Sequence, residues 1–112
     1  MSVYIINNMV IHDREEYDQY VRAFLPIFLK YQGEVVALQD DPAPLEGTWP
    51  YSRTVILRMP SAEKTREWYE SPEYQAIAAQ RWRSTKSNVV ILPEFRGSSR
   101  GRDAPGAAGQ EP

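Results

Sequence analysis

The sequence predicts an α+β fold in which strands and helices follow one another in the order β-α-β-β-α-β. Short runs rich in β-branched residues indicate four strands, and two longer stretches repeat their apolar residues every three or four positions, as amphipathic helices do. Capping residues and prolines lie at the junctions between these segments. This order is that of the ferredoxin-like plait, a four-stranded antiparallel sheet covered by helices on one face.

The first half of the chain predicts a strand over Val3–Ile11 and then a helix. Asp13 and Glu16 have the spacing of a capping box, so we expect the helix to begin there and Gly33 to end it. Pro26 lies inside this helix and should bend it. One apolar helix face is formed by Tyr17, Tyr20, Val21, Phe24, Leu25 and Phe28.

The second half predicts strands over residues 34–38, 53–59 and 88–95, with helical sequence before the last of them. Ser61 is placed to cap a helix that runs through Tyr69. A second serine, Ser71, is followed by a proline, which is typical of the first turn of a new helix. We therefore expect two helical segments between the third and fourth strands.

Length and composition predict one domain over residues 1–95 and a flexible tail over residues 96–112. The 112 residues are 42% hydrophobic and 25% charged, as in ordinary globular domains. Gly97–Pro112 contains no aromatic or β-branched residue, so it offers nothing to bury.

Several kinds of site are excluded by composition. The chain has no cysteine and a single histidine, so disulfides, thiolate metal sites and multi-histidine metal sites are ruled out, and we expect no metal and no cofactor. The net charge of −2 gives no general attraction to nucleic acid or to anionic membranes. No apolar run is long enough to span a membrane, and a cytoplasmic location is the default expectation.

Both faces of the predicted sheet carry apolar residues. In the first strand Val3, Ile5 and Met9 alternate with Tyr4, Ile6 and Val10. Helices cover only one face, so the other needs a partner. We expect two copies to pair through this face as a homodimer, because a two-fold axis lets one surface serve both copies.

A set of motifs resembles the DUF1330 family over residues 3–95. The motifs are Asp13…Tyr17…Tyr20, then Leu45-Glu46-Gly47-x-Trp49-Pro50, Arg53, and Trp68-Tyr69-x-Ser71-Pro72-x-Tyr74-Gln75. The resemblance implies a dimeric α/β barrel, related to small monooxygenases, isomerases and dechlorinating enzymes. It implies a fold and a dimer more than a reaction, since the family itself has no established activity.

Polar residues on the face away from the helices suggest a small-molecule pocket between the paired sheets. Strand alternation places Tyr4, Asn8 and His12 on one face, and Arg58 is expected to share it. His12 is a candidate for proton exchange near neutral pH, and Arg58 for holding a carboxylate or enolate oxygen. The alternatives are a solvated histidine and a surface ion pair.

The 14-residue segment Gln39–Ser52 is longer than a tight hairpin, and loops of this length are often functional. Glu46 is a catalytic candidate because it lies beside the aromatic ring of Trp49, a candidate ligand contact. Alternatively, Trp49 packs the loop onto its own subunit or a partner, and Glu46 caps local amides or pairs with Arg53.

Two tyrosines at the break between the helical segments, Tyr69 and Tyr74, are further candidate ligand contacts, or else core residues with hydroxyls at the surface. On the last helix we expect Gln75, Arg81 and Arg83 to be solvated or to lie at the rim of a dimer.

Two functional hypotheses follow. The first is a cofactor-free enzyme, isomerase-like or monooxygenase-like, acting on a small, partly apolar metabolite. The second is a non-catalytic module that binds a small molecule or a protein. RNA recognition is excluded because the third strand has no aromatic residue on which bases could stack.

Overall fold

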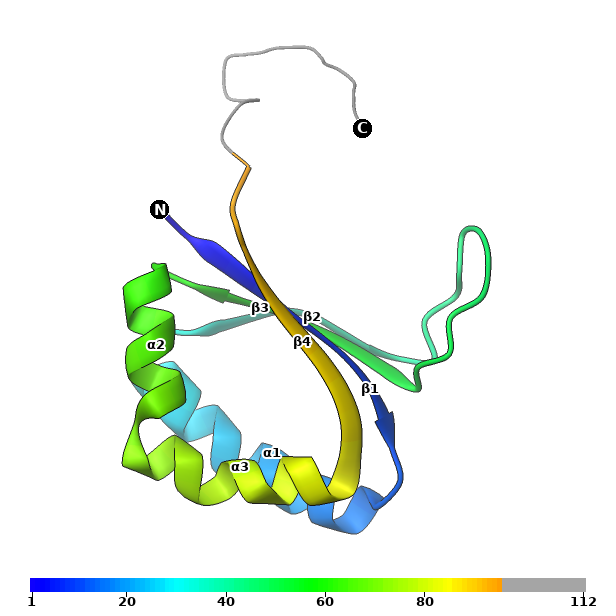
Figure 1. Ribbon diagram of the computed structural model, residues 1–112, viewed down its shortest axis with the longest axis horizontal. Coiled ribbons are helices and arrows are strands. Elements are labelled where there is room, and N and C mark those ends of the chain that lie inside the picture. Colours follow the sequence, from blue (N-terminus) through cyan, green and yellow to red (C-terminus); the bar gives the residue numbers. More distant parts are fainter. Residues whose placement is uncertain (96–112) are drawn as a thin grey trace.

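The computed structural model describes residues 1–95, and the tail predicted over residues 96–112 lies outside the described part. Four antiparallel strands form one sheet in the order β2-β3-β1-β4, and three helices gather on one side of it (Figure 1). This is the predicted α+β, ferredoxin-like arrangement. No helix within residues 1–95 is long and apolar enough to cross a membrane.

Strand β1 (Val3–Ile11) lies at the centre of the sheet, between β3 (Arg53–Met59) and β4 (Thr85–Pro93). Its odd-numbered residues face the helices and are buried from Val3 to Met9, whereas its even-numbered residues face the other way. The register places Tyr4 opposite Arg58. We call the sheet face opposite the helices the open face; its residues in these strands are Tyr4, Ile6, Asn8, Thr54, Ile56, Arg58, Asn88, Val90 and Leu92.

Helix α1 (Arg14–Lys30) begins as predicted, with the Asp13 carboxylate accepting a hydrogen bond from the Glu16 amide at 3.1 Å. The end of α1 involves Gln32 as well as the predicted Gly33. Gln32 takes the left-handed conformation (φ 69°), and the following Gly33 amide donates to the Phe28 carbonyl at 2.9 Å. Gly33 is needed for space, because a Cβ there would lie 2.4 Å from the Phe28 ring.

Helices α2 (Ala62–Glu70) and α3 (Pro72–Ser84) meet at Ser71, as the sequence predicts. The Ser71 hydroxyl donates to the Trp68 carbonyl at 2.8 Å and accepts from the Tyr74 amide at 3.1 Å. One buried serine thus ends α2 and caps α3. It also fixes where Trp68 and Tyr74 stand relative to each other.

Two strands differ in extent from the prediction. Strand β2 (Glu34–Asp40) continues past Leu38, and β4 covers Thr85–Pro93 in place of residues 88–95. β4 follows α3 without a linker, because the Thr85 hydroxyl and amide both donate to the Arg81 carbonyl. The added positions are mostly polar, so an apolar pattern did not reveal them.

Candidate functional site

A cavity of about 830 Å³ lies between the sheet and the helical layer. It reaches from β2 on one edge of the sheet to β4 on the other. The helical layer is held together by its own aromatic rings, with Phe28 5.0 Å and Tyr74 4.5 Å from the Trp68 ring centroid. The sheet contributes an apolar floor of Ile5, Met9, Val55, Leu57, Val89 and Ile91.

Two buried polar atoms in the cavity wall have no hydrogen-bond partner among residues 1–95. They are Oδ1 of Asn7, on the helix-facing side of β1, and Nε1 of Trp68, on α2. Both side chains are at least nine-tenths buried. Leaving such atoms unpaired costs about 1–3 kcal/mol each, and both belong to residues that line the cavity.

Three further polar side chains in the wall contact one another. The Tyr20 and Tyr74 hydroxyls are 2.9 Å apart, and Arg81 Nε donates to the Tyr74 hydroxyl at a long 3.4 Å. Burial raises the pKa of the Tyr20 phenol well above its usual value, and the Tyr74 hydroxyl raises it further. Tyr20 therefore stays protonated at neutral pH.

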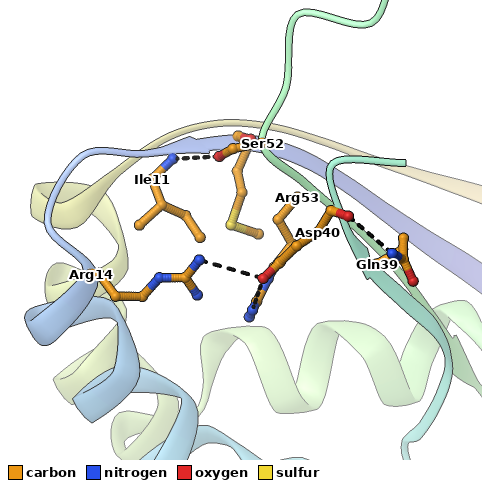
Figure 2. Close-up of polar contacts among 7 residues, drawn as sticks. Ile11, Arg14, Gln39, Asp40, Ser52 and Arg53 are labelled. Carbon is orange, nitrogen blue, oxygen red and sulfur yellow. Dashed lines mark hydrogen bonds and ion pairs between the residues drawn. The ribbon is translucent and has the colours of Figure 1, made fainter. Parts of the chain in front are cut away.

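The cavity ends at a cluster of charges where β1 meets α1. Figure 2 shows Arg53 and Arg14 converging on the Asp40 carboxylate from two directions. Asp40 Oδ2 lies 3.1 Å from Arg53 Nη2 and 3.4 Å from Arg14 Nη2. Hydrogen bonding from Arg53 lowers the pKa of Asp40. The Arg53 guanidinium also lies 5.4 Å from the ring centroid of Tyr17, a cavity residue, so this cluster fixes one wall of the cavity.

Comparison with known proteins identifies the family. The model of a domain of unknown function, DUF1330, matches residues 2–95. The chain belongs to the DUF1330 family. No curated protein matches it.

Solved structures resemble this DUF1330 domain in fold at low sequence identity. A protein of unknown function from Rhodopseudomonas palustris, RPA0582, is 19% identical over 85% of this chain and 83% of its own, with a TM-score of 0.73. SnoaB from Streptomyces nogalater, a cofactor-independent oxygenase, is 13% identical over 87% and 96%, with a TM-score of 0.64. A dimeric ferredoxin-like protein of unknown function from Thermobifida fusca is 14% identical over 84% and 92%, with a TM-score of 0.55.

The predicted site residues of the DUF1330 domain divide between the two faces of the sheet. Tyr69 and Tyr74 line the cavity. Tyr4, Asn8 and Arg58 share the open face as predicted, but the cavity lies on the opposite face. The expected position of the pocket, on the face away from the helices, thus does not coincide with the cavity that the structure contains.

On the open face, Arg58 forms a surface ion pair. Its Nη2 lies 3.2 Å from Glu94 Oε1, and its guanidinium lies 5.9 Å from the Tyr4 ring centroid. Of the two roles expected for Arg58, ligand contact or surface ion pair, the structure contains the ion pair. At the other end of the same face, Asn8 Oδ1 is buried and has no hydrogen-bond partner within the described chain.

The other three candidates lie outside the cavity. His12 is exposed just beyond β1, and its backbone amide donates to the Ser84 carbonyl at 2.9 Å. Glu46 is exposed on the loop between β2 and β3, which extends away from the sheet (Figure 1). The suggested Glu46–Arg53 pair is wrong, because Arg53 pairs with Asp40.

Trp49 packs the loop onto its own chain, which was one of the alternatives for this residue. Its Nε1 donates to the Thr54 hydroxyl at 3.1 Å, and its ring centroid lies 5.4 Å from that of Tyr51. Tyr51 in turn accepts from Asn88 Nδ2 at 3.3 Å. These contacts set the loop at one end of the open face.

Sequence reasoning missed four cavity residues as functional candidates: Asn7, Tyr20, Trp68 and Arg81. The prediction that Arg81 is solvated or lies at the rim of a dimer is wrong, since its exposed fraction within one chain is 6%. Spacing carried a signal, because Arg81 follows Tyr74 by seven positions and Ala78 by three, on the buried face of α3. Asn7 stands between Ile5 and Met9 on the buried side of β1, where an apolar residue is the rule.

Proposed function

We propose that this protein binds a small, partly apolar molecule in the cavity between the sheet and the helices. The observation that carries the proposal is a largely apolar cavity of about 830 Å³ whose wall holds buried, unpartnered polar atoms on Asn7 and Trp68. Ligand sites typically combine an apolar lining with a few polar groups that orient the ligand.

A cofactor-free reaction, isomerase-like or oxygenase-like, is the second candidate. It is supported by the contact between Tyr20, Tyr74 and Arg81 inside the cavity, which could exchange a proton with a bound oxygen and hold the resulting charge. Against it, the only carboxylate lining the cavity in the described chain, Glu70, is exposed, and His12 lies elsewhere. Binding is therefore the function that the geometry supports better.

The proposed partner is a second copy of the chain, seated on the open face. Val90 and Leu92 are 55% and 40% exposed there, and Ile6 and Ile56 lie beside them at the centre of the sheet. An apolar sheet face of this kind pairs favourably with itself across a two-fold axis.

A cavity-filling substitution tests the proposed binding. Val55 lines the cavity, so Val55→Phe should weaken binding of the neutral probe 1-naphthaleneacetamide at least tenfold in isothermal titration calorimetry. The matched control is Val36→Phe, because Val36 is exposed and does not line the cavity. The proposal is wrong if the wild-type protein binds neither this probe nor the corresponding acid, 1-naphthaleneacetate, or if Val55→Phe binds the probe as well as the control does.

A further inference from the structure

The cavity contains a buried positive charge with no counter-ion. Arg81 is 6% exposed and lines the cavity from α3. Within residues 1–95 it takes part in no ion pair, and its only side-chain hydrogen bond is the long one to Tyr74. We propose that the ligand is an organic acid whose anionic oxygen pairs with Arg81, an inference that rests on the proposed binding function.

The chemistry of the guanidinium group supports an anion specifically. Arginine has five N–H donors, accepts no hydrogen bond and stays charged at all ordinary pH values. A buried charge without a partner destabilises the protein, so such a charge is normally paired with a carboxylate. Arg83, on the same helix, shows the ordinary arrangement, with an exposed side chain that pairs with Glu16.

The neighbouring tyrosines do not replace the missing anion. Tyr20 is a neutral phenol because burial raises its pKa, and its hydroxyl is engaged with Tyr74. When Arg81 and Tyr20 both donate to the Tyr74 oxygen, the Tyr74 proton is left to donate to a ligand. The guanidinium and this hydroxyl then form two adjacent donors suited to one carboxylate or enolate group.

The rest of the cavity restricts the remainder of the acid. The floor is aliphatic, with Ile5, Val55 and Leu57, and α1 adds the Phe24 ring. The ligand class is therefore an amphipathic acid with one anionic end and an apolar body.

The test compares an acid with its uncharged amide. Titration calorimetry of the full chain at pH 7 should show that 1-naphthaleneacetate binds at least tenfold more tightly than 1-naphthaleneacetamide. Arg81→Met should abolish this preference while still binding the amide. Arg83→Met removes an exposed charge from the same helix and should keep the preference.

Two further measurements guard against a misfolded variant. Arg81→Lys retains the charge and should keep part of the preference for the acid. In thermal unfolding, Arg81→Met without ligand should be at least as stable as the wild-type protein, because a buried unpaired charge is gone. Naphthaleneacetate should raise the Tm of this variant no more than naphthaleneacetamide does.

The outcomes separate this inference from the proposed function. If the wild-type protein binds the amide as tightly as the acid, or if Arg81→Met keeps the preference, the organic-acid inference is wrong and the binding function stands. If neither compound binds, both are wrong.

Discussion

Asp40 joins three parts of the chain that are distant in sequence. It ends β2, and its carboxylate receives Arg53 from β3 and Arg14 from α1 (Figure 2). Arg53 in turn covers the Tyr17 ring at the end of the cavity. The carboxylate therefore links the sheet edge to the first helix. Protonation of Asp40 should lower the free energy of unfolding of the domain.

We predict that Asp40→Asn lowers the free energy of unfolding at pH 7 by at most about 1 kcal/mol, since the Asp40 side chain is 42% exposed and solvent screens the pair. Arg53 lowers the folded-state pKa of Asp40 below its usual 3.8. The contribution is thus complete well above that value and is lost as the pH falls through the folded-state pKa. Denaturant unfolding between about pH 7 and pH 2 should show the difference in unfolding free energy between the wild-type protein and Asp40→Asn shrinking as the pH falls.

The neighbouring residue supplies the control for Asp40. Asp41 forms no ion pair within the described residues, and its left-handed conformation (φ 47°) suits asparagine as well. Asp41→Asn should leave stability unchanged over the same pH range. Equal effects of the two substitutions would rule out the proposed role of Asp40.

Residues with local partners were predictable from sequence, and residues with distant partners were not. Asp13, Ser61 and Ser71 each accept from an amide three positions later, so spacing alone identifies them as caps. Arg53 was not assigned to Asp40, and Arg81 was expected in solvent. Their partners come from other elements, and only the packing of those elements decides between a surface and a buried position.

Gly33, at the end of α1, and Gly47, in the loop between β2 and β3, are required for different reasons. Gly33→Ala places a methyl group against the fully buried Phe28 ring and should destabilise the protein by about 1–3 kcal/mol. Gly47→Ala meets no atom within 4 Å but has φ +74°, so only conformational strain of about 1–2 kcal/mol is expected.

Shortening the Phe28 side chain distinguishes a steric clash at Gly33 from backbone strain. In Gly33→Ala a smaller neighbour, Phe28→Leu, should recover part of the lost stability, and the two substitutions should be non-additive in thermal unfolding. Gly47→Ala and Phe28→Leu should be additive, because the loop glycine does not touch the ring. Additivity in the Gly33 pair would exclude the steric explanation.

The order of the elements was predictable from periodicity and capping residues, but the ends of β2 and β4 and the space between the layers were not. The alternation in β1 separates the buried odd-numbered residues from the even-numbered ones, and the structure keeps that separation. What periodicity cannot give is the distance between layers. Phe28 and Tyr74 each pack on Trp68 within the helical layer, and the cavity lies between this layer and the sheet.

The two faces of the sheet thus carry separate roles in the whole molecule. The helix-facing side lines the proposed ligand site. The open face, with Ile6 and Ile56 on the central strands and Val90 on the edge strand β4, is proposed to receive a second copy. The residues predicted to bind ligand from the open face, including Tyr4 and Arg58, would then lie at or near the interface. Their role in ligand binding stays a prediction.

Sedimentation at micromolar concentration should give twice the chain mass of 12.9 kDa. Ile56→Lys places a charge at the centre of the open face without touching the cavity, so it should give a folded monomer. Trp82→Lys changes an exposed apolar residue on α3 and should remain dimeric. A monomeric wild-type protein, or a dimer that survives Ile56→Lys, would remove the open face as the interface. Either result leaves the proposed binding function standing, because the residues that line the cavity all come from one chain.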